Sequence, residues 1–222
     1  MTPRELLGSA DVPGGEALQL YRRGRDFTIM AGRVELMGSR MSGSEEALAR
    51  MTAERLRPAA APRWLIGGYG MGFTLRAALA VTAPAAVIEA VELVPGILDW
   101  ARGPMAELTG GCLDDRRVRL RIGDVGAAVA AAESLYDAIL LDVDNGPDGL
   151  TRAGNERLYT PDGLRAARAA LRPGGILAVW SAAPDPRFGK RLASAGFQVE
   201  EVAVRARANG KGPRHVIWFA RR

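Results

Sequence analysis

After Pro62 the chain repeats one pattern: a short run of apolar residues, then a turn or linker, then a segment with helical spacing. The apolar runs occupy residues 64–68, 86–93, 118–123, 136–142 and 175–182. Because apolarity within these runs is largely continuous, the strands are expected to be covered on both faces of the sheet. The pattern predicts a doubly wound α/β fold with a mostly parallel sheet.

The end of the chain departs from this alternation. Residues 197–206 and 214–220 both favour strands, and the turn sequence Asn209-Gly210-Lys211-Gly212 lies between them. Two strands joined by such a turn form a hairpin. We therefore expect a seven-stranded sheet whose last strand runs antiparallel.

The first 60 residues follow a different pattern. Short β-prone stretches separated by glycines predict a small antiparallel meander over residues 17–22, 26–31 and 34–37. A helix is expected next, with Ser44 as its N-cap and its end before Pro58. We accordingly predict two units: a small N-terminal β-meander with a helix at 1–60, and an α/β domain at 61–222.

A glycine-rich turn follows the first strand of the predicted α/β domain. Gly68, Gly70 and Gly72 come after that strand and before a helix that begins near Thr74. Glycines let a ligand press against the backbone, and a helix N-terminus offers unpaired N–H groups. In this context the turn indicates a nucleotide-binding site. The alternative is a tight turn whose glycines only satisfy geometry.

Acidic residues end the next two strands. Glu92 lies 24 residues after Gly68 (92 minus 68), where an acid can accept hydrogen bonds from both ribose hydroxyls. Asp124 ends the third strand, where it can hold an adenine amino group or cap the helix that follows. Glu89 lies on the opposite strand face from Glu92 and is interpreted as packed or facing solvent.

The fourth strand leads directly into Asp142, which is followed by Asp144 and Asn145. Ligands of open α/β sheets bind outside the carboxyl ends of the strands, so these side chains are expected in the crevice. A carboxylate there can accept a proton from an amine or stabilise a sulfonium, whereas the alternative is an Asx turn. Asn155 and Tyr159 are further candidates for this pocket, although Tyr159 is equally consistent with packing.

Together these motifs resemble class I S-adenosylmethionine (SAM)-dependent methyltransferases and, within that Rossmann-like fold, the spermidine synthase family of polyamine aminopropyltransferases. The resemblance covers most of the chain. It is carried by IGGYGMGFTLR at 66–76, VELVPGILDWAR at 91–102, DDRRVRLRIGDV at 114–125, YDAILLDVD at 136–144 and LYTPDGLRAARAALRPGGILAVW at 158–180. The segment DFTIMAGRVELM, followed by SEEALARM, also resembles the N-terminal hairpin and first helix of that family.

The resemblance implies a site for a sulfonium nucleoside, which is either SAM or decarboxylated SAM. The glycine turn would bind it, with Glu92 at the ribose and Asp124 at the adenine. Asp142 would position or deprotonate the attacking amine. Analogy with the family also suggests a homodimer.

Three departures from the family pattern concern the substrates. Met71 aligns with an aspartate that contacts the aminopropyl amine, Ser44-Glu45-Glu46 replaces a Tyr-His-Glu run facing the acceptor, and the second acid after the fourth strand is shifted to Asp144. Glu45, Asn145, Asn155 and Tyr159 are therefore candidate acceptor contacts.

These departures bear on the choice of donor. The ammonium tail of decarboxylated SAM needs carboxylates, which Met71 does not supply, whereas Arg76 or a backbone nest can hold the carboxylate of SAM. The sequence thus favours SAM-dependent methyl transfer to a small nucleophile such as an amine. One alternative is aminopropyl transfer to a diamine, with Asp144 and Glu45 or Glu46 as the acids. The other is a nucleoside-binding protein without turnover.

Composition narrows the remaining classes. The chain has a net charge of +5, but its basic residues are scattered among acidic ones and are not interleaved with aromatic residues, so no nucleic-acid partner is expected. The single cysteine, Cys112, excludes an intrachain disulfide, and no metal site is expected around it. His215, the only histidine, is expected to be packed. Because no leader or membrane span is apparent, we expect a cytoplasmic protein.

Overall fold

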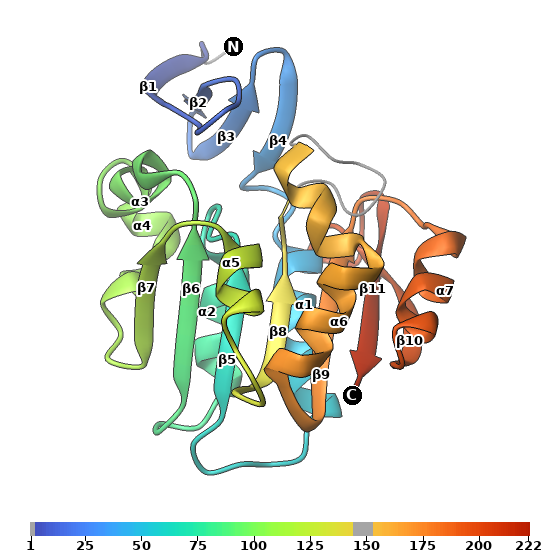
Figure 1. Cartoon of the computed structure of the whole chain (residues 1–222). Coiled ribbons are helices and arrows are strands. Elements are labelled where there is room, and N and C mark those ends of the chain that lie inside the picture. The colour runs from blue at the N-terminus through green and yellow to red at the C-terminus, as the bar shows by residue number, and fades with distance from the viewer. Residues whose placement is uncertain (1–2, 144–152) are drawn as a thin grey trace.

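The computed structural model describes residues 3–143 and 153–222, which contain two β-sheets (Figure 1). The larger sheet has seven strands in the order β10-β11-β9-β8-β5-β6-β7. Its strands are β5 (Arg63–Gly67), β6 (Val87–Glu92), β7 (Val118–Ile122), β8 (Tyr136–Leu141), β9 (Leu171–Ser181), β10 (Gln198–Arg205) and β11 (Arg214–Arg221). Strands β5 to β9 are parallel, and β11 is antiparallel to both of its neighbours. The predicted α/β fold with an antiparallel last strand is confirmed.

The smaller sheet is an antiparallel meander at the N-terminus. Its strands are β1 (Glu5–Ala10), β2 (Leu18–Arg23), β3 (Asp26–Ala31) and β4 (Val34–Gly38). The three predicted strands are present, and β1 is an additional one that the sequence pattern did not indicate. Gly8 lets β1 pack closely on the main domain, because a Cβ at this position would lie 2.9 Å from the Trp100 indole nitrogen.

Helices cover both faces of the larger sheet. Those packed with one hydrophobic cluster are α1 (Gly43–Arg55), α2 (Phe73–Val81), α3 (Pro95–Arg102), α4 (Ala106–Thr109) and the 3₁₀ turn η1 (Cys112–Asp114). Those packed with a second cluster are α5 (Val125–Ala130), η2 (Ala153–Tyr159), α6 (Pro161–Ala170) and α7 (Pro186–Ser194). In Figure 1, α5 and α6 lie in front of the sheet, with α1 and α2 behind it. No helix within the described ranges is long and apolar enough to cross a membrane.

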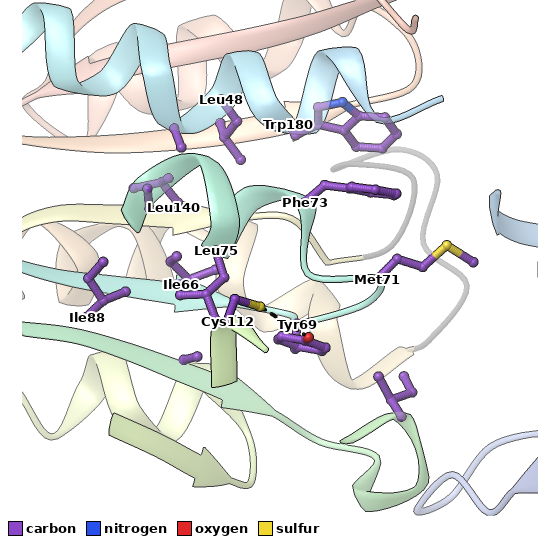
Figure 2. Packing of buried hydrophobic residues seen from close by; sticks show 14 of the residues in the cluster. Leu48, Ile66, Tyr69, Met71, Phe73, Leu75, Ile88, Cys112, Leu140 and Trp180 are labelled. Atoms are coloured by element: carbon purple, nitrogen blue, oxygen red, sulfur yellow. Dashed lines mark hydrogen bonds between the residues drawn. The ribbon is translucent and has the colours of Figure 1, made fainter. Parts of the chain in front are cut away.

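The two clusters explain the continuous apolarity of the strands. In β5, Trp64 and Ile66 belong to the first cluster, whereas Leu65 between them belongs to the second. Successive side chains of a strand point to opposite faces, so a strand buried on both faces is apolar at every position. Figure 2 shows part of the first cluster, in which Leu48 of α1 lies near Leu75, Ile66 and Leu140.

Helix α1 begins two residues earlier than predicted. Its N-cap is Ser42, so the prediction of Ser44 as the cap is wrong. Ser44 is buried within the helix, and its hydroxyl is hydrogen-bonded to His215 Nδ1 at 2.8 Å. Long-range contacts explain the shift, because the Gly43 N–H donates to the Ala206 carbonyl at 2.8 Å. The domain boundary near residue 60 stays a prediction; α1 itself packs on the larger sheet.

Candidate functional site

A cavity of about 260 Å³ lies where the carboxyl ends of the parallel strands face the N-terminal sheet. The predicted site residues that line it are Glu45, Gly68, Gly70, Glu92, Asp124, Asp142 and Asn155. Residues of the N-terminal sheet, such as Leu18, Ile29 and Met37, form the opposite wall. Asp144 and Asn145 lie outside the described residues. The acids that end three separate strands therefore do converge on one cavity.

The glycine turn at the start of α2 is shaped by two close approaches. Gly68 has φ +82°, and a Cβ there would lie 2.5 Å from the carbonyl oxygen of Asp142. Gly70 has φ +55°, and a Cβ there would lie 2.6 Å from the Met37 methyl carbon. Gly68 thus needs glycine both for packing against the backbone and for its left-handed conformation, whereas Gly70 needs it for the left-handed conformation, because the end of the Met37 side chain can move aside. Gly72 is not among the lining residues, since it approaches the Tyr69 hydroxyl instead.

Glu92 is held by the main chain of this turn. The carboxylate is 5% exposed and accepts hydrogen bonds from the N–H groups of Tyr69 at 2.9 Å, Gly70 at 3.4 Å and Val94 at 2.9 Å. Backbone donors satisfy a buried charge in the way that a counter-ion would. The spacing predicted the position of Glu92. It did not predict that the carboxylate accepts hydrogen bonds from the N–H groups of the glycine turn.

Two further amides of the turn have partners within the protein. The N–H of Gly68 donates to Val91 and that of Gly72 to Tyr69. The amides of residues 68, 69, 70 and 72 are therefore bonded to protein oxygens.

Asp124 has a structural role at the rim of the same cavity. Its carboxylate caps α5 by accepting a hydrogen bond from the Ala127 N–H at 3.1 Å, and it forms an ion pair with Arg157. The cap that the sequence offered as one interpretation is thus present. Because Asp124 also lines the cavity, a contact to a ligand is open to it in addition.

Asp142 and Glu45 form the most unusual electrostatic part of the site. Thr74 Oγ1 donates a hydrogen bond to Asp142 Oδ2 at 2.8 Å, and burial raises the pKa of Asp142 to about 6. Glu45 is 8% exposed, and burial together with the charges of Asp142 and Glu46 raises its pKa well above the ordinary value. Two acids that disfavour each other's ionisation thus face one cavity.

Several residues singled out in the sequence lie elsewhere. Met71 is fully buried in the first cluster and is not a lining residue (Figure 2). Arg76 donates to the Leu108 carbonyl at 2.7 Å and is not a lining residue either. Tyr159 is 2% exposed and packs edge-on against Phe188 at 5.6 Å between ring centroids. Among these three, none therefore contributes a side chain to the cavity lining.

The cavity also includes residues that sequence reasoning missed. Glu16 comes from the segment between β1 and β2, and Met37 from β4. Trp180 is buried, yet it also lines the cavity and packs edge-on against His215 at 4.8 Å between ring centroids. Its place at the carboxyl end of β9 was the available signal. Within residues 3–143 and 153–222, no group of His, Cys, Asp and Glu side chains could hold a metal ion.

A glycine turn and strand-end acids surround one cavity at the carboxyl ends of the strands, which is where doubly wound α/β proteins bind their ligands. No family model matches the chain. In sequence it is similar to the polyamine aminopropyltransferases of Korarchaeum cryptofilum (33% identical over 117 residues, 53% of this chain and 34% of the relative) and Nitrosomonas europaea (34% over 106 residues, 46% and 31%). The matched part of the chain thus spans about a third of the length of these relatives.

Two solved structures show the same fold. Spermidine synthase from Thermotoga maritima aligns with a TM-score of 0.76 at 18% identity, and a spermidine synthase in complex with the transition state analogue AdoDATO aligns with 0.75 at 17%. Each alignment covers 97% of this chain and 72% of the other chain. The predicted resemblance to the spermidine synthase family is confirmed in sequence and in fold.

Proposed function

We propose that this protein transfers an aminopropyl group from decarboxylated SAM to a small amine. The charge of the cavity is the observation that carries the proposal. Its lining contains five acids, Glu16, Glu45, Glu92, Asp124 and Asp142, and the described lining residues include no Lys, Arg or His. A donor with a sulfonium and an ammonium group suits such a cavity, whereas SAM adds a carboxylate that would face like charges.

The positions of the residues do not support the reasons for which the sequence favoured methyl transfer. Arg76 is bonded to a carbonyl and is not a lining residue, so it is not placed to hold the carboxylate of SAM. The amides of residues 68, 69, 70 and 72, which could contribute to a backbone nest, are bonded to protein oxygens. Met71 is also not a lining residue, and Glu45 and Asp142 bring acids to the cavity instead. Aminopropyl transfer, the alternative from the sequence, fits better and agrees with the names of the relatives.

In the proposed reaction the lone pair of the acceptor nitrogen attacks the propyl carbon bonded to sulfur. The carbon–sulfur bond breaks, its electron pair goes to sulfur, and the sulfonium becomes the neutral thioether of methylthioadenosine. Asp142 accepts the proton that the amine loses, a task for which a raised pKa suits a carboxylate. Alignment of nitrogen, carbon and sulfur supplies most of the rate enhancement. We assign Glu92 to the ribose, Asp124 to the adenine, and Asn155 with Asp144 and Asn145 to the acceptor side.

The products distinguish the alternatives. We expect methylthioadenosine when the protein is incubated with decarboxylated SAM and 1,4-diaminobutane, followed by mass spectrometry. We expect no S-adenosylhomocysteine from SAM with the same amine. The opposite result would restore methyl transfer. If calorimetry detects binding of methylthioadenosine but neither product forms with any C3 to C5 diamine, the protein is a nucleoside-binding protein without turnover.

A further inference from the structure

Two acidic residues line the cavity where helices α1 and α2 approach the end of β8. Glu45 lies in the first turn of α1, and Asp142 directly follows β8. Thr74 in α2 lies between these two segments, since its hydroxyl donates to Asp142 Oδ2 at 2.8 Å and lies 3.4 Å from the main-chain carbonyl oxygen of Glu45. Both side chains line the cavity.

These two acids differ from the other buried acid of the cavity in what neutralises them. Glu92 is compensated by three N–H groups. Glu45, by contrast, has a carboxylate oxygen, Oε2, that is buried without a hydrogen-bond partner among residues 3–143 and 153–222. A buried, ionised carboxylate without a hydrogen-bond partner costs free energy. Such a group therefore binds either a proton or a cationic ligand.

Among residues 3–143 and 153–222, the groups named here around the pair supply no positive charge. Glu46 on α1 adds a negative charge that raises the pKa of Glu45 further. His215 on β11 is hydrogen-bonded to the neighbouring Ser44, and burial lowers the pKa of His215, so the imidazole is neutral near pH 7. Thr74 on α2 and Trp180 on β9 are uncharged. Glu92 and Asp124 line the same cavity as further acids.

We propose that Glu45 is a positioning residue that sets the proton state of Asp142: the unliganded pair holds one shared proton, and an arriving ammonium group displaces it. This inference rests on the proposed function only in taking an amine as the ligand. The displaced proton leaves to the buffer. Once both groups are ionised, the negative charge of Glu45 makes Asp142 a stronger base than an isolated carboxylate, which favours removal of a proton from the bound amine.

Proton release on binding tests the proposal directly. Wild-type protein, saturated with methylthioadenosine, is titrated with 1,4-diaminobutane at pH 6.5 in buffers of different ionisation enthalpy. We expect release of up to about one proton per site for a pair that shares a single proton. Glu45→Gln should reduce the release at least twofold, whereas Glu54→Gln, an exposed acid on the same helix, should leave it unchanged. Unchanged release in Glu45→Gln, or no release by the wild type, would overturn the proposal.

A second measurement needs no ligand and therefore separates this inference from the proposed function. Raised pKa values mean that the folded protein binds more protons than the unfolded chain, so the free energy of unfolding should fall as the pH rises from about 4 through 6. This contribution is fully present below the ordinary carboxyl pKa. Denaturant unfolding at several pH values should show a shallower fall in both Glu45→Gln and Asp142→Asn. Profiles as steep as that of the wild type would contradict a shared proton even if aminopropyl transfer is observed.

Discussion

Glu92 and Asp142 end the two strands that flank β5, and both carboxylates face the same cavity, yet their surroundings are opposite. Glu92 accepts three backbone N–H groups, whereas the one side-chain donor found for Asp142 among the described residues is the Thr74 hydroxyl. The main chain supplies the hydrogen-bond donors of the first acid. Within the described ranges the second has a single such donor, and burial raises its pKa to about 6. Under the proposed function, the nucleoside side of the cavity is preorganised by the main chain, and the amine side is completed by the substrate.

Asp142→Asn should have the largest effect. Asparagine keeps the shape and can still accept the hydrogen bond from Thr74, but it cannot accept a proton from the amine. We expect methylthioadenosine formation to fall by about 10²–10⁴-fold, the usual contribution of a general base. Stability at pH 7.5 should not fall, because the change removes a buried charge. Full activity in this variant would exclude Asp142 as the base.

Gly68→Ala tests the close approach that places the glycine turn beside Asp142. The added methyl group would meet the Asp142 carbonyl at 2.5 Å in a left-handed backbone. We expect a loss of about 3 kcal/mol in the free energy of unfolding, from strain plus the displaced backbone. Gly174→Ala is the matched control, because Gly174 has φ +80° but open space around the added Cβ. It should cost about 1 kcal/mol. Equal losses would show that the contact with Asp142 does not matter.

Glu92→Gln should weaken the preorganised side. The amide replaces one acceptor oxygen by a donor that faces backbone N–H groups, so we expect a loss of about 2 kcal/mol in stability. Binding of methylthioadenosine, measured by calorimetry, should weaken as well. Glu89→Gln on the opposite face of the same strand, where Glu89 accepts from the Tyr136 hydroxyl, is the control and should leave nucleoside binding unchanged. Equal nucleoside affinity in both variants would count against the ribose assignment.

Asp124→Ala should have the smallest effect on stability, about 1 kcal/mol for the lost helix cap. Asp124→Asn separates the two roles of this residue, because asparagine caps α5 equally well but cannot form the ion pair with Arg157. We expect Asp124→Asn to unfold at nearly the wild-type denaturant concentration. If it is as unstable as the alanine variant, the ion pair rather than the cap stabilises this turn.

The fold was predictable because strands that are covered on both faces are apolar at almost every position of the sequence. Strand β1 was missed, since ELLGSA contains a glycine and has an irregular register between Leu6 and Gly8. The start of α1 was misplaced because contacts with residues near 206, far along the chain, decide it. The residues around position 44 do not by themselves indicate contacts with residues so far along the chain.

The site was predictable wherever a strand end fixes the position of a residue, as at Glu92, Asp124 and Asp142. The direction of side chains was not predictable from the sequence. Met71 and Arg76 were therefore used to choose between SAM and decarboxylated SAM, although neither residue lines the cavity. Glu16 and Met37 were missed because a second sheet brings them to the cavity. The homodimer and the cytoplasmic location stay predictions.

The turn of α1 that contains Glu45 is tied to the far end of the chain. The Gly43 N–H donates a hydrogen bond to the Ala206 carbonyl, and the Ser44 hydroxyl is hydrogen-bonded to His215 on the last strand. During synthesis the ribosome makes the helix early, but these two hydrogen bonds of its first turn cannot form until residues 206–215 have emerged. A nascent chain stalled before that hairpin would therefore contain Glu45 and Asp142 without the two hydrogen bonds that hold the start of α1 to the last strands.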